Sequence, residues 1–135
     1  MENTVKINLE NLKGMSYKDR CSLANNDYKT SSYELDMLVD LLDEKEDNYY
    51  NNFLKNTIAR NLNTSAETLD KLLKLNNTSY EIPLAIANHR NASAEILDEL
   101  STYTKTEYID TWTCSIIRHN VAQNKNTSSE TLDKL

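Results

Sequence analysis

The chain has 135 residues, a formal net charge of −6 and a sequence pI near 4.9. This acidic balance argues against general attraction to a phosphate backbone, and a single Gly and a single Pro argue against sheet-rich folds, which need many turn residues. No stretch approaches the ~18 consecutive apolar residues of a membrane-spanning helix. We therefore expect a cytoplasmic protein of one domain, residues 1–135, with no membrane contact.

The N-terminal residues 1–15 are polar, with scattered apolar side chains such as Leu9 and Leu12. We expect a short lead-in segment here that covers the open end of a stacked structure. Gly14 is expected to end it. Ser16, with Asp19 three residues later, has the pattern of a helix start and predicts a helix over residues 17–25.

One motif recurs along the rest of the chain, at residues 58–72, 86–100 and 121–135, with a looser copy at 23–38. Its pattern is aliphatic-Ala-x-Asn, a short polar turn, Thr-Ser, then Leu-Asp-x-Leu. Four copies in register predict a repeat architecture. We predict an all-α fold, an α-solenoid of about four two-helix repeats centred on 17–47, 48–78, 79–110 and 111–135.

Within each copy, the first helix is expected to end at the Asn of aliphatic-Ala-x-Asn. Asn26, Asn61 and Asn124 stand where a residue that tolerates the left-handed conformation is favoured, and His89 takes this place in the third copy. The preceding alanine is small enough for neighbouring backbones to approach closely.

The second helix of each copy is expected to start at Thr-Ser. Thr64-x-x-Glu67 and Thr127-x-x-Glu130 match the capping box, in which the Thr hydroxyl and the Glu carboxylate each accept a backbone N–H. The first copy has Ser31-x-x-Glu34 instead. In the third copy either Asn91 or Ser93 must supply the cap.

The spacing of the copies alternates. The motif alanine recurs after 35, 28 and 35 residues, at Ala24, Ala59, Ala87 and Ala122. We expect the seven extra residues in the connections at about 40–50 and 101–110, on equivalent sides of the molecule. Pro83 is tolerable in a short helix over 80–88 if Ser79 caps it, because Pro then lies in the first turn.

The pattern resembles the leucine-rich repeat variant family, whose repeat reads roughly Val-x-x-Ala-Val-Ala-x-Asn-Pro-Asn-Thr-Pro-x-x-x-Leu-x-x-Leu. The matching residues are Ile82-x-x-Ala85-Ile86-Ala87, Asn91 and Leu97-x-x-Leu100, and Leu54-x-x-Thr57-Ile58-Ala59-x-Asn61-x-Asn63-Thr64 with Leu69 and Leu72. The resemblance implies a right-handed, HEAT-like superhelix of paired helices. The family prolines and any iron–sulfur cysteine cluster are missing here, so the resemblance carries a fold and no function.

The sequence indicates no catalytic, metal or cofactor site. His89 and His119 have no nucleophile or carboxylate beside them in a catalytic motif, and His89 occupies a structural position of the repeat. Cys21 and Cys114 lack the spacing of metal ligands and are expected to be reduced thiols rather than a disulfide. We predict that the protein is not an enzyme and needs no cofactor.

A local excess of acidic residues gives a stronger indication of a binding site than the histidines and cysteines do of a catalytic or metal site. Residues 34–47 contain seven acids and one lysine, a charge of −6 that equals that of the whole chain. Such a segment is either a solvated face or a surface that docks on a basic partner. The candidate partner-binding residues are Asp36, Asp40, Asp43, Glu44, Glu46, Asp47, Tyr49, Tyr50, Tyr103 and Tyr108. Phe53, Ile109 and Trp112 are expected in the core.

The function that these features favour is macromolecule binding, most of all to a protein with a basic surface. A nucleic-acid enzyme is one such protein, and the composition, rich in Asn, Lys, Tyr and Ile, would suit an inhibitor from a bacterium, phage or mobile element. Two alternatives stay open. One is a nucleic-acid-binding solenoid with a ridge of Arg60, Arg90, Arg118 and Lys125, and the other is a fragment of a longer repeat scaffold.

Overall fold

The computed structural model describes residues 8–42, 49–75, 80–104 and 109–135, and all regular structure in these ranges is α-helical. The prediction of an all-α fold is confirmed. The helices are α1 (Leu9–Lys13), α2 (Tyr17–Ala24), α3 (Ser32–Asp40), α4 (Tyr49–Arg60), α5 (Ala66–Lys74), α6 (Glu81–Ala87), α7 (Ala94–Ser101), α8 (Thr111–Gln123) and α9 (Ser129–Lys134).

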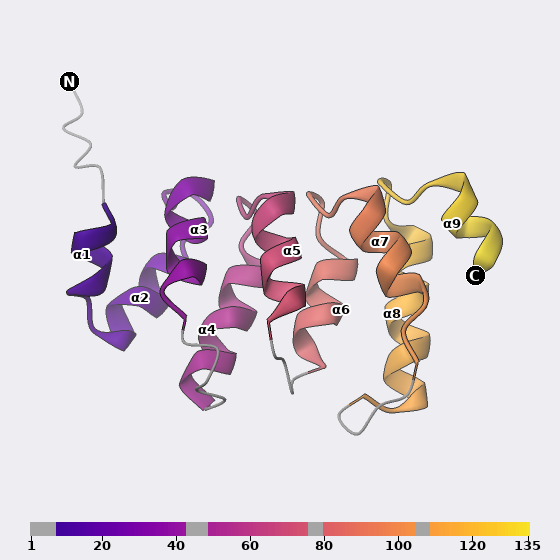
Figure 1. Ribbon diagram of the computed structural model, residues 1–135, viewed down its shortest axis with the longest axis horizontal. Coiled ribbons are helices and arrows are strands. Elements are labelled where there is room, and N and C mark those ends of the chain that lie inside the picture. The colour runs from indigo at the N-terminus through magenta and orange to yellow at the C-terminus, as the bar shows by residue number, and fades with distance from the viewer. Residues whose placement is uncertain (1–7, 43–48, 76–79, 105–108) are drawn as a thin grey trace.

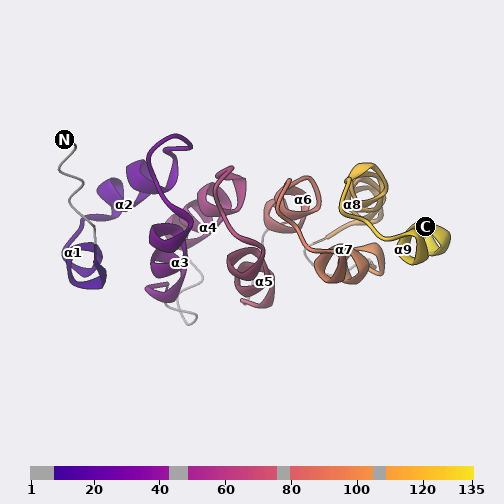
Figure 2. The same ribbon diagram turned by 90° about the horizontal axis from the view of Figure 1, so that it is seen from above.

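The helices form two rows (Figure 2). The first row consists of α2, α4, α6 and α8, and the second row of α3, α5, α7 and α9, with α1 packed against α3 at the N-terminal end. Each first-row helix contacts the next one in its row, and in the second row α3 contacts α5 and α7 contacts α9. The turns that carry the Asn and Thr-Ser residues lie along the upper edge of Figure 1. The N-terminal ends of α4, α6 and α8 lie along the lower edge.

The core lies between the two rows. The motif leucines of α3, α5 and α7 are fully buried, as are Ala24, Ala59 and Ala87 at the ends of the first-row helices. At the C-terminal end, Leu132 of α9 and Leu135, which follows the helix, are 45% and 43% exposed, because no further helix in the described structure covers them. Both cysteines are free thiols, as expected.

Two of the second-row helices, α5 and α9, start one residue later than predicted. The N-cap of α5 is Ser65, whose hydroxyl accepts the N–H of Thr68, and Ser128 caps α9 in the same way. Thr64 faces inward, fully buried, and donates its hydroxyl to the carbonyl of Ile58. The predicted capping boxes on Thr64 and Thr127 are therefore wrong. The other caps are Ser31, in a capping box with Glu34 as predicted, and Ser93, one of the two alternatives for the third copy.

The motif asparagines do not adopt the left-handed conformation, since no non-glycine residue in the described ranges has a positive φ. Their carboxamides instead join each turn to the preceding one. Asn61 Nδ2 donates to the carbonyl of Ala24 at 2.8 Å, and Asn124 Nδ2 donates to Ala87 at 3.0 Å. The asparagines two residues later, Asn63, Asn91 and Asn126, each donate to two carbonyls of the turn before.

The seven extra residues of the long spacers contribute to helix rather than only to connections. The helices α4 and α8 have 12 and 13 residues, whereas α6, after the short spacer, has seven. Pro83 lies in the first turn of α6 as expected, but the N-cap is Tyr80 and not Ser79, which lies outside the described residues. The lengthened N-terminal part of α8 carries Trp112, which is 74% exposed. Phe53 is also exposed, so both expected core positions are wrong, while Ile109 packs on the core.

Candidate binding surfaces

The two predicted acidic site residues that the structure describes are both held by one lysine of the next second-row helix. The ammonium of Lys71 on α5 lies 2.9 Å from a carboxylate oxygen of Asp36 and 3.2 Å from one of Asp40. The hydroxyl of Thr68 also donates to Asp36, at 2.8 Å. These hydrogen bonds raise the pKa of Lys71. Asp36 therefore has a structural role between α3 and α5, which leaves it less available to a partner.

The same bridge recurs between α7 and α9. Asp98 accepts from the hydroxyl of Thr131 and from the ammonium of Lys134, and these bonds hold its pKa below the ordinary value. Between α5 and α7 the bridge is missing, because Ile96 stands in the Thr position and Glu99 in the Lys position. Asp70 bonds Lys74 of its own helix there, at 2.7 Å.

The remaining predicted site residues are scattered. Tyr49 and Tyr50 lie at the start of α4, both exposed, in an aromatic cluster with Tyr17 and Phe53. Tyr103 is half-buried against the core, and burial raises its pKa. The tyrosines of α4 are in the first row and Asp36 and Asp40 in the second, so they do not form one patch. Asp43, Glu44, Glu46, Asp47 and Tyr108 lie outside the described residues.

The charges of the molecule separate by row, a feature that the charge of local segments in the sequence does not reveal. The described second-row helices carry ten acidic and three basic residues, a formal charge of −7. The first-row helices carry five basic and two acidic residues, a formal charge of +3. Acidity thus extends along the whole second row, beyond the segment at residues 34–47. A shallow hollow of about 290 Å³ between α5 and α7 is lined by four of these acids, Glu67, Asp70, Glu95 and Glu99.

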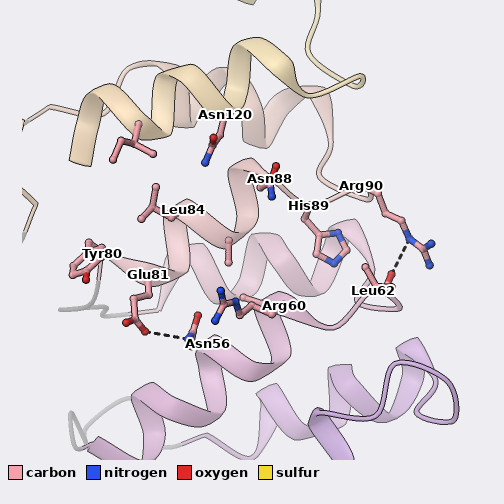
Figure 3. Close-up of a pocket in the computed structure, with 13 residues that line it drawn as sticks. Asn56, Arg60, Leu62, Tyr80, Glu81, Leu84, Asn88, His89, Arg90 and Asn120 are labelled. Carbon is pink, nitrogen blue, oxygen red and sulfur yellow. Dashed lines mark hydrogen bonds between the residues drawn. The ribbon is translucent and has the colours of Figure 1, made fainter. Parts of the chain in front are cut away.

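The larger hollow is in the first row. A groove of about 590 Å³ runs over α6 between α4 and α8, and we call it the α6 groove (Figure 3). Its apolar lining includes Leu84, Ala85 and Ile116, and its polar lining includes the three asparagines Asn56, Asn88 and Asn120 with Arg60 and Arg90. Asn56 donates to a carboxylate oxygen of Glu81 at 3.0 Å across the α4–α6 boundary.

The predicted basic ridge is only partly assembled. Arg60 and Arg90 line the same groove, and Nε of Arg90 donates to the carbonyl of Leu62 at 3.1 Å. Arg118 is half-buried on α8, and Lys125 is exposed in the following turn. Neither of these two residues lines the α6 groove.

His89 has a structural environment. Its side chain is 5% exposed, Nδ1 accepts the N–H of Asn91 at 2.9 Å, and Nε2 lies 2.7 Å from the carbonyl of Asn61. Because a backbone N–H can only donate, Nδ1 carries no proton and Nε2–H donates to Asn61. Burial lowers the pKa of His89, which favours this neutral ring. Among the described residues, no three His, Cys, Asp or Glu side chains gather as a metal site would require.

Comparisons with known proteins give no relative: no family model, no curated protein and no solved structure matches this chain. Among the described helices, none is long and apolar enough to cross a membrane.

Proposed function

We propose that this protein is a non-enzymatic α-solenoid that binds a protein with a basic surface through the acidic face of its second row. The observation that carries the proposal is the formal charge of −7 on the described second-row helices, against +3 on the first row. A face of one sign attracts an oppositely charged partner over a distance and orients it on approach.

Two features support the solenoid itself. The asparagine bonds join consecutive turns in one direction, from each copy of the motif to the copy before it. The Asp36 and Asp98 bridges do the same between second-row helices. Bonds of this kind support a stack of repeats, and the right-handed sense of the proposed superhelix is what the resemblance to the leucine-rich repeat variant family implies. A frame of this kind presents its face with little entropy lost on binding.

The partner class that fits this face is a protein with a basic, exposed surface, and an enzyme that works on nucleic acid has such a surface. Inhibition by occupying it needs no catalysis by the solenoid. The formal charge also disfavours direct binding of nucleic acid to the second row.

Affinity capture from the source cell with purified protein tests the proposal. We expect the double substitution Glu95→Gln/Glu99→Gln, on the exposed face of α7, to reduce recovery of a basic partner, and added salt to release it. The double substitution Glu10→Gln/Asp19→Asn removes as much charge outside the second row and is the matched control. A second arm changes Asp40, Asp43, Glu44 and Asp47 to Asn or Gln and tests the segment singled out by the sequence.

Equal recovery with all variants would contradict the proposal. Recovery that is lost after nuclease treatment would instead favour the nucleic-acid-binding alternative.

A further inference from the structure

The α6 groove exists because three neighbouring first-row helices differ in length. Both α4 and α8 begin further from the motif alanine than α6 does, so their N-terminal parts extend beyond it on either side. Tyr49 and Trp112 occupy equivalent positions in these extensions, each ten residues before the alanine, at Ala59 and Ala122. Their side chains are 76% and 74% exposed.

The groove offers paired hydrogen-bonding groups over an apolar floor. Within the described part of the chain, the carboxamides of Asn88 and Asn120 bond neither backbone nor another side chain, and Asn120 projects from α8 toward α6 (Figure 3). A carboxamide supplies one acceptor and two donors, which complement the N–H and C=O of a peptide unit. Leu84 and Ile116 beside them provide apolar surface for a side chain of the ligand.

The charge of the groove selects a negative ligand group. The guanidinium of Arg60 lies in the groove next to Asn56 and forms no ion pair within the described structure (Figure 3). Among the described residues that line the groove, Glu81 is the only one with a carboxylate, and this carboxylate already accepts a hydrogen bond from Asn56. A carboxylate on the ligand would bond the Arg60 fork in two-point geometry.

One turn before the groove residue Ile116, α8 carries an exposed tryptophan, Trp112. Trp112, Ile116 and Asn120 are spaced by four residues and therefore lie on one face of the helix. An exposed tryptophan beside an apolar hollow is the residue type that dominates binding energy at protein interfaces.

We propose that the α6 groove binds an extended peptide segment of a partner protein. Asn88 and Asn120 hold the main chain of the segment, Arg60 binds an acidic side chain, and Leu84, Ile116 and Trp112 contact an apolar one. The site lies in the opposite row from the acidic face of the proposed function and prefers the opposite charge, so each can fail without the other. A single-stranded nucleic acid fits less well, because such a ligand needs a strongly positive groove along its phosphate backbone. The described lining has two arginines and one carboxylate, which leaves a formal charge of only +1.

A phage-displayed library of random 12-residue peptides, panned against the full chain, tests the site. Peptides that also bind the triple variant Arg60→Ala/Asn88→Ala/Asn120→Ala are removed by counter-selection. We expect the enriched sequences to share an Asp or Glu near an aliphatic or aromatic residue. The best peptide, labelled with a fluorophore, is then titrated with each variant by anisotropy.

Arg60→Glu should weaken binding at least about tenfold, because it replaces a charge-assisted hydrogen bond by repulsion. Trp112→Ala should also weaken binding, whereas Lys125→Glu and Tyr33→Ala, matched exposed substitutions outside the groove, should leave it unchanged. The altered side chains are exposed or half-exposed, and thermal unfolding confirms that each variant is folded.

The proposal would be overturned by enrichment of no acidic motif, by equal binding of the peptide to Arg60→Glu, or by binding of a labelled oligo(dT) 12-mer in place of peptides. Weakening by Glu95→Gln/Glu99→Gln alone would assign the peptide to the acidic face of the second row and also overturn it.

Discussion

At the scale of single residues, the motif position of Asn61 requires a side chain that both donates and accepts a hydrogen bond. The carboxamide of Asn61 is 2% exposed, accepts the N–H of Asn63 through Oδ1 and donates through Nδ2 to the carbonyl of Ala24. Aspartate would lack the donor, and a residue chosen only for the left-handed conformation would lack both groups. A buried carbonyl without a partner costs about 1–3 kcal/mol, so the position selects Asn.

The imidazole of His89 replaces this carboxamide in the third copy and makes the turn sensitive to acid. Since burial lowers its pKa in the folded state, the unfolded chain takes up the proton first as the pH falls. The contribution of the neutral ring to stability is therefore complete above pH ~6.5 and declines below it, toward the lowered pKa. Protonation at Nδ1 would also remove the acceptor for Asn91. We expect His89→Asn to reduce the loss of stability below pH ~6.5, measured by urea unfolding at several pH values.

His119, exposed on α8, provides the control for this experiment. His119→Asn removes one imidazole from an exposed position and controls for that change in composition. An identical acid profile for His89→Asn and the unmodified protein would show that His89 is not the titrating group.

At the scale of helices, the Thr-Ser pair at the start of α5 contains two residues that could each be the N-cap. Thr64-x-x-Glu67 matches a capping box, but Ser65 stands equally well three residues before a backbone N–H, that of Thr68. Packing decides between them. The hydroxyl of Thr64 bonds the carbonyl of Ile58 in a fully buried site, while Ser65 is half-exposed at the helix end. Thr and Ser are both suitable N-cap residues, so the sequence alone does not decide which of the two caps the helix.

Substitution of the cap of α5 tests this register. Ser65→Ala should lower the free energy of unfolding by about 1 kcal/mol, because the N–H of Thr68 loses its acceptor. Ser65→Asp should keep the cap and most of the stability. Thr64→Asp should be far more damaging, since it buries a carboxylate at a fully buried position. Chemical denaturation followed by circular dichroism measures all three, and equal tolerance of Asp at 64 and 65 would place the cap at Thr64 instead.

The helices of the first row explain why the α6 groove was not predicted. The spacing of 35, 28 and 35 residues indicated extra residues, but spacing does not reveal whether such residues form helix or loop. Trp112 and Phe53 resemble core residues by type, and only the outward face of the lengthened helices leaves them exposed. The predicted candidates followed local charge and aromatic content, whereas the groove combines Arg60 of α4, Asn88 at the end of α6 and Asn120 of α8.

At the scale of the molecule, the separation of charge follows from stacking. Residues 34–47 carry a charge of −6, equal to that of the whole chain, so the charges outside this segment sum to zero. In the structure, second-row acids such as Glu67, Glu95 and Glu130, which are far apart in sequence, lie in one row. Net charge per segment was readable from the sequence. The side on which each charge lies required the two-row arrangement.

Because of the same arrangement, leucines at equivalent motif positions contribute differently to the free energy of unfolding. Leu69 of α5 and Leu132 of α9 occupy the same motif position, yet Leu69 is fully buried under the next helix pair and Leu132 is 45% exposed. Leu69→Ala should lower the free energy of unfolding by about 2–5 kcal/mol, because it leaves a cavity in the core. Leu132→Ala should cost under about 1 kcal/mol, because its side chain has already kept much of its contact with water. Urea unfolding of the two variants measures the difference. A cost for Leu132→Ala close to that of Leu69→Ala, lost on dilution of the protein, would show that a second copy covers α9.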